Sequence, residues 1–224
     1  MTFSLVARCA RTGQFGHAIS SSSIAVAARC SFARAGVGAV STQNVTDPSL
    51  GPATLDLLAR GLSASDALDE IRRTGTHLAY RQILVIDAEG RTAIHSGPKA
   101  LGVWAEARGT DVASGGNLLA NAEVPAATVA APEASTGDLG DRLIAAMQAG
   151  LAAGGEAGPV HSAGLKVVDA VSWPVADLRV DWTDDCPIAA LAALWDRYKP
   201  QLADYVTRAL DPSAAPAYGV PGDT

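Results

Sequence analysis

Aromatic side chains, cysteines and positive charge are scarce in this sequence. Aromatic residues make up 5% of the 224 residues, whereas hydrophobic residues make up 48%. That apolar content argues against disorder, and a core of small and branched side chains is typical of sheets covered by helices. The formal net charge of -6 argues against nucleic acid as a partner, because phosphate binding needs a basic surface.

The cysteines and the hydropathy pattern point to a reducing compartment. Cys9, Cys30 and Cys186 are odd in number and lack C-x-x-C spacing, which argues against a disulfide framework or a structural zinc site. The first residues lack the basic segment of a signal peptide. No apolar run reaches the ~20 residues that span a bilayer. We therefore expect a soluble, cytoplasmic protein without membrane contact.

Short apolar runs between turn signals predict strands grouped in hairpins. The predicted strands cover residues 3–9, 15–20, 36–43, 82–87, 91–95, 111–114, 162–171 and 175–180. Hairpins exclude a repeating βαβ architecture, so two mainly antiparallel sheets between helical layers fit better. We expect an α+β protein with a single domain over residues 1–210 and a flexible tail over residues 211–224.

Helices are predicted where apolar residues recur with a period near 3.6. One follows Pro48, a second begins with Ser65 as its N-cap, and a third covers residues 118–122. The pattern over residues 138–153 ends at two glycines, which is typical of a helix C-terminus. The last helix is expected to run without interruption over residues 187–210.

The start of the chain contains the clearest chemical feature. A hydroxyl nucleophile needs a base, and an N-terminal threonine can use its own α-amine for this. That amine has an ordinary pKa of about 7.7–8.0 and so accepts a proton near neutral pH. Thr2 becomes N-terminal when Met1 is removed, which a small second residue permits. Many proteins begin in this way without such a role, so this feature alone does not identify an enzyme.

Ten segments along the chain together carry a family resemblance. They are residues 2–8, 13–16, 35–43, 47–52, 61–64, 82–90, 116–119, 153–155, 161–163 and 177–181. Their order and spacing resemble a bacterial and archaeal family called domain of unknown function 1028, of the N-terminal-nucleophile (Ntn) hydrolase type. The resemblance implies a four-layer αββα sandwich. It also implies hydrolysis of an amide bond in a small molecule, with Thr2 as the catalytic nucleophile.

Within this resemblance, Asn117 is the second catalytic candidate. It follows two glycines, where its side-chain amide and nearby backbone N–H groups would stabilise an oxyanion. The alternative is that Asn117 only caps the following helix.

Four residues are candidates for substrate binding. Ser21 ends a strand expected beside Thr2, where it orients the amine, contacts substrate or only forms a turn. Thr42 and Gln43 end another strand in the same region, and His161 precedes a later strand.

Two positions depart from the family pattern. Ser22 stands where relatives commonly have lysine, and His161 stands where glutamine is more usual. A lysine would tune the amine or bind an anion, and Ser22 can do neither. These departures leave open a pocket of different polarity or a loss of activity.

The remaining sequence features favour neither a metal nor a cofactor. The four histidines form no H-x-x-x-H or H-E-x-x-H pattern. We expect a small-molecule substrate as the partner and a homo-oligomer, because related folds often pair through helical faces. Two other classes stay open: a non-catalytic small-molecule-binding protein that retains the fold, and a structural assembly subunit.

Overall fold

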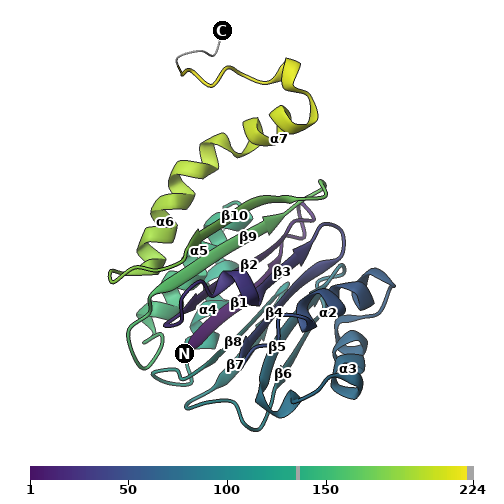
Figure 1. The fold of residues 1–224 in the computed structure, drawn as a ribbon, viewed down its shortest axis with the longest axis vertical. Helices are drawn as coiled ribbons and strands as arrows, with labels where there is room; N and C mark the ends of the chain where they lie inside the picture. Colours follow the sequence, from purple (N-terminus) through teal and green to yellow (C-terminus); the bar gives the residue numbers. More distant parts are fainter. Residues whose placement is uncertain (135–136, 221–224) are drawn as a thin grey trace.

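The computed structural model describes residues 1–134 and 137–220, and in these residues two antiparallel sheets form the centre of the protein (Figure 1). The strands are β1 (Thr2–Arg8), β2 (Phe15–Ser21), β3 (Ser31–Arg34), β4 (Gly38–Asn44), β5 (Arg81–Asp87), β6 (Thr92–Ser96), β7 (Ala105–Gly109), β8 (Val112–Asn117), β9 (Ser162–Val168) and β10 (Pro174–Val180). One sheet has the order β10-β9-β2-β1-β8-β7 and the other β3-β4-β5-β6. The predicted mixture of helices with two antiparallel sheets is confirmed.

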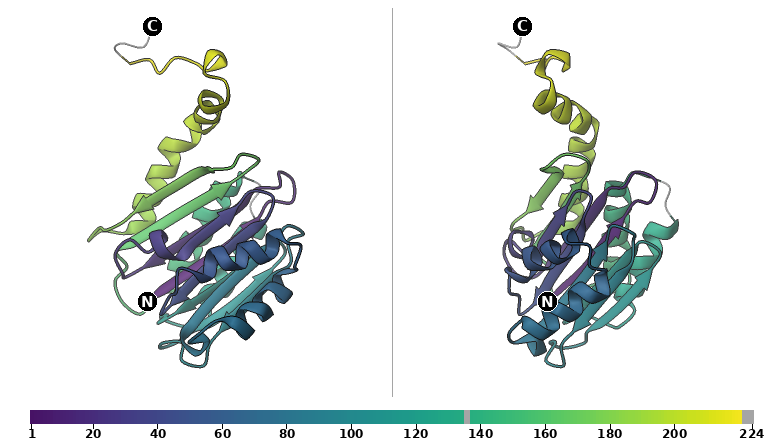
Figure 2. Two further views of the ribbon diagram at one scale, coloured as in Figure 1. Left: turned by 45° about the vertical axis from the view of Figure 1, so that its right-hand side comes forward. Right: turned by 90° about the vertical axis from the view of Figure 1, so that its right-hand side faces the viewer.

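The helices lie mainly on the outer faces of the sheets, except for the short first helix, which contacts a strand of each sheet. They are α1 (Ala27–Cys30), α2 (Leu50–Ala59), α3 (Ala64–Thr74), α4 (Val124–Ala134), α5 (Leu139–Ala152), α6 (Pro187–Tyr198) and α7 (Leu202–Leu210), with short 3-10 turns at Leu78–Tyr80, Lys199–Gln201 and Pro212–Ala214. Helices α4, α5 and α6 contact the six-stranded sheet, α2 and α3 contact the four-stranded sheet, and the sheets contact each other through β1, β4, β5 and β8. Both views of Figure 2 show the yellow end of the chain, which contains α7, extending away from the sheets.

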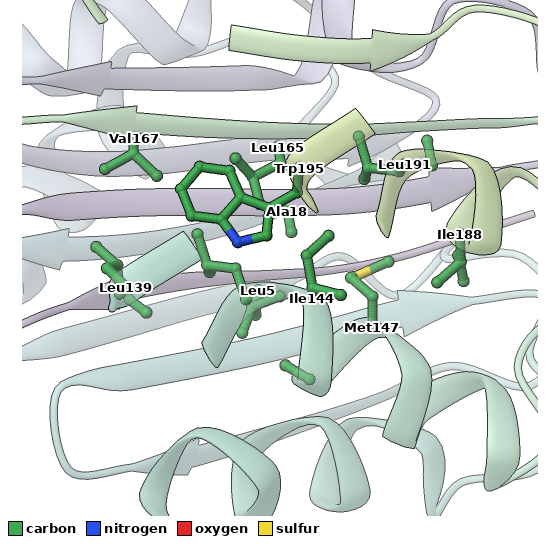
Figure 3. Packing of buried hydrophobic residues seen from close by; sticks show 14 of the residues in the cluster. Leu5, Ala18, Leu139, Ile144, Met147, Leu165, Val167, Ile188, Leu191 and Trp195 are labelled. Atoms are coloured by element: carbon green, nitrogen blue, oxygen red, sulfur yellow. The ribbon is translucent and has the colours of Figure 1, made fainter. Parts of the chain in front are cut away.

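Strand β1 contributes to two different layers because successive side chains of a strand point to opposite faces. Phe3, Leu5 and Ala7 face the helices and belong to the largest apolar cluster. Figure 3 shows how this cluster is filled from the six-stranded sheet by Leu5, Ala18, Leu165 and Val167, from α5 by Leu139, Ile144 and Met147, and from α6 by Ile188, Leu191 and Trp195. Burial of each large side chain stabilises the fold by about 1.5–3 kcal/mol.

The layer between the two sheets is apolar at one end and polar at the other. Val6 lies in an apolar cluster with Phe15, Ala39, Leu84, Ile86, Ile94, Ala113 and Val168. Further toward the chain start, Ser4 and Thr2 occupy the same face of β1, and both are buried. The beginning of β1 therefore brings polar groups into a desolvated space between the sheets.

Two predicted helices near the middle of the chain differ from the structure. Residues 118–122 form no helix, because β8 pairs with β1 as far as Asn117 and the helix begins only at Val124. The helix predicted to start at Ser65 instead has Ser63 as its N-cap, and the Ser63 hydroxyl accepts a hydrogen bond from the Asp66 amide at 3.2 Å.

The predicted final helix is also wrong in its continuity. It divides into α6 and α7 at the 3-10 turn Lys199–Gln201, where Pro200 has no amide N–H to donate. Strands β3 and β7 were not expected from the sequence, because both are short edge strands that carry charged residues. Of the predicted tail, residues 221–224 lie outside the described residues.

His17 on β2 is the one histidine that is fully buried, and no ring nitrogen of it has a hydrogen-bond partner in the described part of the chain. Burial, together with the positive charge of Lys166, lowers its pKa from 6.5 to about 3. The folded protein therefore holds His17 neutral.

This predicts a loss of stability in acid. Below pH 6.5 His17 binds a proton in the unfolded chain. In the folded chain it binds that proton only below about pH 3. Stability from this group is therefore present above pH 6.5 and is lost as the pH falls through that window. Urea unfolding across the window should show a flatter pH dependence for His17→Leu than for the unchanged protein. Equal slopes for the two proteins would contradict the prediction.

Candidate active site

Thr2 lies between two partner strands at the beginning of β1. It pairs with Ser21 on β2 and with Asn117 on β8. Directly opposed residues of antiparallel strands point to the same face of the sheet, so all three side chains are directed toward the four-stranded sheet. Thr2 is 6% exposed, and Ser21 and Asn117 are each 1% exposed. The structure thus brings together three of the predicted site residues in a nearly water-free position.

The backbone carbonyl of Met1 is bound by two side-chain hydroxyls. Thr2 Oγ1 donates to the Met1 oxygen, and Ser21 Oγ donates to the same oxygen at 2.6 Å. The two hydroxyl oxygens lie 3.1 Å apart. The Ser23 amide donates to Ser21 Oγ at 3.1 Å, which fixes the orientation of that hydroxyl. This arrangement holds an acyl carbonyl beside a threonine hydroxyl.

A chain of hydrogen bonds connects the two sheets next to this position. Ser4 Oγ donates to Gln43 Oε1 at 2.6 Å, and Gln43 Nε2 donates to Gln82 Oε1 at 2.7 Å. Asn117 Nδ2 also donates to Gln82 Oε1, at 3.4 Å. Since buried polar groups are costly unless paired, this network fixes the Gln43 and Asn117 amides at one position. Gln43 thus supports the site from the second sheet.

Two predicted binding residues lie elsewhere. Thr42 alternates with Gln43 along β4, so its side chain points to the opposite face, where its hydroxyl contacts that of Thr46 at 3.2 Å. The His161 ring stacks on Trp182 with centroids 4.3 Å apart, and its Nδ1 lies 2.9 Å from the Thr183 carbonyl. His161 reaches the site only through its backbone, since its amide donates to the Ser21 carbonyl at 2.9 Å.

Glu156 is a site residue that the sequence analysis missed. It follows Gly154 and Gly155, whose φ angles of 123° and 58° turn the chain back after α5. Glu156 is 7% exposed, its Oε2 accepts from the Ser22 amide at 3.2 Å, and its Oε1 has no hydrogen-bond partner among the described residues. The signal was an acidic residue directly after a helix-ending glycine pair, which the sequence analysis used only to end the helix.

The electrostatics of Glu156 tie it to the start of the chain. Burial raises the pKa of its carboxyl from 4.5 to about 8. The positive N-terminal amine of Met1 and the Ser22 amide both act in the opposite direction. A buried carboxyl therefore lies within electrostatic reach of the α-amine that precedes Thr2.

Asn117 is the last residue of a strand, so its interpretation as a helix cap is wrong. After it, Leu118 adopts the left-handed region with φ 52° and the chain leaves the sheet. The described residues contain no group of three or more histidine, cysteine, aspartate or glutamate side chains that could hold a metal ion. No helix among them is long and apolar enough to cross a membrane.

Comparison with known proteins identifies the family. The family model described as "Family of unknown function (DUF1028)" matches residues 2–191. The chain belongs to the DUF1028 family. The crystal structure of protein SPO2555 from Silicibacter pomeroyi, a DUF1028 protein, superposes with a TM-score of 0.84 and 28% sequence identity, covering 91% of this chain and 89% of that chain.

Two further comparisons add little. Anbu (ancestral beta-subunit) from Yersinia bercovieri gives a TM-score of 0.41 at 11% identity, covering 91% of this chain and 97% of that chain. No curated protein matches the chain. The DUF1028 match starts at Thr2 and includes Glu156, and it ends within α6, so α7 lies outside it.

The raised pKa of Glu156 predicts a loss of stability at alkaline pH. The unfolded carboxyl releases its proton near pH 4.5, whereas the folded one keeps it up to about pH 8. The stability from this group is therefore full below pH 4.5 and is lost as the pH rises through about 8. Glu156→Gln imitates the neutral acid. The difference in melting temperature between this variant and the unchanged protein should therefore grow in favour of the variant as the pH rises.

Thermal unfolding of both proteins across this pH range tests the prediction. Glu106→Gln is the matched control, because Glu106 is an exposed glutamate on the edge strand β7. The control should leave the pH dependence of the melting temperature unchanged. A Glu156→Gln protein with the same pH dependence as the control would show that the buried carboxyl is already ionised.

Proposed function

We propose that this DUF1028 protein is an Ntn hydrolase that cleaves an amide bond in a small molecule, with Thr2 as its nucleophile after removal of Met1. One observation carries the proposal: the hydroxyls of two buried residues, Thr2 and Ser21, converge on the carbonyl oxygen of the Met1–Thr2 peptide bond. The packing of helices on the outer faces of two stacked sheets supports the four-layer αββα architecture that this class of hydrolase has.

The reaction begins when Thr2 Oγ1 attacks the carbonyl carbon of the substrate amide. The free α-amine of Thr2 accepts the hydroxyl proton, directly or through a water molecule. The C–N bond of the amide then breaks, and the leaving amine takes up that proton. Water hydrolyses the resulting ester on Thr2, which releases the acid and restores the hydroxyl. No cofactor takes part in these steps.

The developing negative charge on the carbonyl oxygen requires hydrogen-bond donors. Ser21 Oγ already donates to a carbonyl oxygen at this position, so it is the first donor in the proposed oxyanion site. Asn117 is the second, because it lies on the other side of Thr2 on the same face of the sheet. Its bond to Gln82 is long, at 3.4 Å, and can be exchanged for one to the oxyanion.

The alternative is a binding protein that retains the fold without catalysis. A cavity of about 420 Å³ favours it, lined by Val171 of the β9–β10 connection, Val175 of β10 and Val206 of α7. This cavity lies at the end of the six-stranded sheet opposite to Thr2, because β9 begins beside Ser21 and ends before the connection. A ligand there would not meet the Thr2 hydroxyl.

Covalent labelling distinguishes the two functions. Intact mass should first show that the purified protein has lost Met1, because a retained Met1 leaves no free amine on Thr2. A β-lactone, which acylates activated hydroxyls, should then add one acyl group to Thr2 and none to Thr2→Ala. Retained Met1, or equal labelling of both proteins, would contradict the proposed nucleophile.

Ser21→Ala tests the proposed oxyanion donor. Loss of one such donor costs about 10²–10³-fold in rate, so the acylation rate by the β-lactone should fall by about that factor. Ser20→Ala is the matched control, because Ser20 is equally buried on β2 but pairs with Phe3 and faces the helices. Equal acylation rates for the two serine variants would remove Ser21 from the mechanism.

A further inference from the structure

Met1 has specific surroundings for a residue that is to be removed. Its carbonyl is bound by Thr2 and Ser21. Glu156 lies beside Met1, because its Oε2 accepts from the amide of Ser22, the residue next to Ser21. The Met1 α-amine accordingly acts to lower the pKa of the Glu156 carboxyl. Its side chain extends across Gly158, where a β-carbon would come within 2.8 Å of Met1 Cε. Each part of this amino acid, carbonyl, amine and side chain, thus has its own neighbour in the site.

These surroundings bear on the substrate because of the chemistry of threonine. An acyl group on the Thr2 nitrogen and one on Thr2 Oγ1 interconvert through a small ring that Cα and Cβ close. The carbonyl carbons of the two forms therefore lie close together. The peptide Met1–Thr2 is the nitrogen isomer of the ester that Thr2 would form with a methionyl substrate. The neighbours of Met1 are accordingly the neighbours expected of an acyl group bound to the nucleophile.

We propose that the substrate is an amide of an α-amino acid, and that Glu156 binds its protonated α-amine. This inference rests on the proposed function for the attack by Thr2. Glu156 is a binding residue for the acyl part of the substrate, and the side chain of the substrate runs over Gly158. The class of substrate is therefore aminoacyl amides, which include short peptides with a free N-terminus.

The chemistry of the Glu156 carboxylate selects a cation. Its Oε1 has no hydrogen-bond partner in the described residues, and no lysine, arginine or histidine there forms a salt bridge with it. A buried ionised carboxylate is costly without a partner of opposite charge. Removal of Met1 takes away its ammonium group and frees the Thr2 amine, which the proposed mechanism uses as a neutral base. A substrate ammonium restores this partner, whereas an acidic acyl group would be repelled.

Binding and hydrolysis are measured separately, so that the two proposals can fail independently. Thr2→Ala, also freed of Met1, binds without turnover, and its affinity for L-methioninamide and for N-acetyl-L-methioninamide is measured by calorimetry. Acetylation removes the charge and should weaken binding by about tenfold or more, because a hydrogen bond between charged groups is worth at least that factor. Adding Glu156→Gln to Thr2→Ala should abolish the preference for L-methioninamide over its N-acetyl form. Adding Glu156→Asp should retain part of that preference.

The protein with Thr2 intact should hydrolyse L-methioninamide and release ammonia, and Glu156→Gln should raise KM more than it lowers kcat. Glu106→Gln again serves as the control for loss of an exposed carboxylate. Equal binding of the two amides, absence of binding, or a preference that survives Glu156→Gln would overturn the assignment of Glu156. A preference that depends on Glu156 without any hydrolysis would support the amine site and refute the proposed nucleophile.

Discussion

Polar side chains on the inner face of β1 have to be paired in the space between the two sheets. Val6 fits the apolar end of this layer, but Ser4 and Thr2 are buried as well. A buried hydroxyl or amide without a partner costs about 1–3 kcal/mol. Ser4 and Gln43 therefore depend on each other across the sheets, and they fix how β4 faces β1. The position of Thr2 relative to the second sheet follows from this pairing.

The same desolvation acts differently on Glu156. Hydroxyls and amides can satisfy one another, whereas a carboxylate needs a positive charge or must hold its proton. One oxygen of Glu156 is satisfied by the Ser22 amide, and the other has no partner among the described residues. The identity of the first residue of the chain thus influences the charge state of the site. Removal of Met1 both exposes the Thr2 amine and changes the partner of Glu156.

Local sequence patterns predicted the helices and strands that are bounded by turn or helix-end residues. They missed features that depend on pairing between segments far apart in the sequence. The hairpin of β5 and β6 follows from short apolar runs around a glycine turn, and the α5 helix from its period and the two glycines that follow it. Asn117 read locally suggests a helix cap. Only pairing of β8 with β1 makes it a strand end beside Thr2. Likewise, Glu156 lies in the site because α5 packs on β2 and the chain after α5 reaches Ser22. The residues next to Glu156 in the sequence give no sign of this contact.

The division between α6 and α7 separates the parts of the chain that the site requires from those that it does not. Trp195 on α6 is 3% exposed and its Nε1 donates to Asp141 at 2.8 Å, so α6 holds α5 against the sheet. Helix α5 in turn leads into the glycine pair and Glu156. Helix α7 has no buried residue and lies beyond the family match. Its contacts are at the far end of the sheet, so changes there can alter the cavity without disturbing Thr2, Ser21 or Glu156.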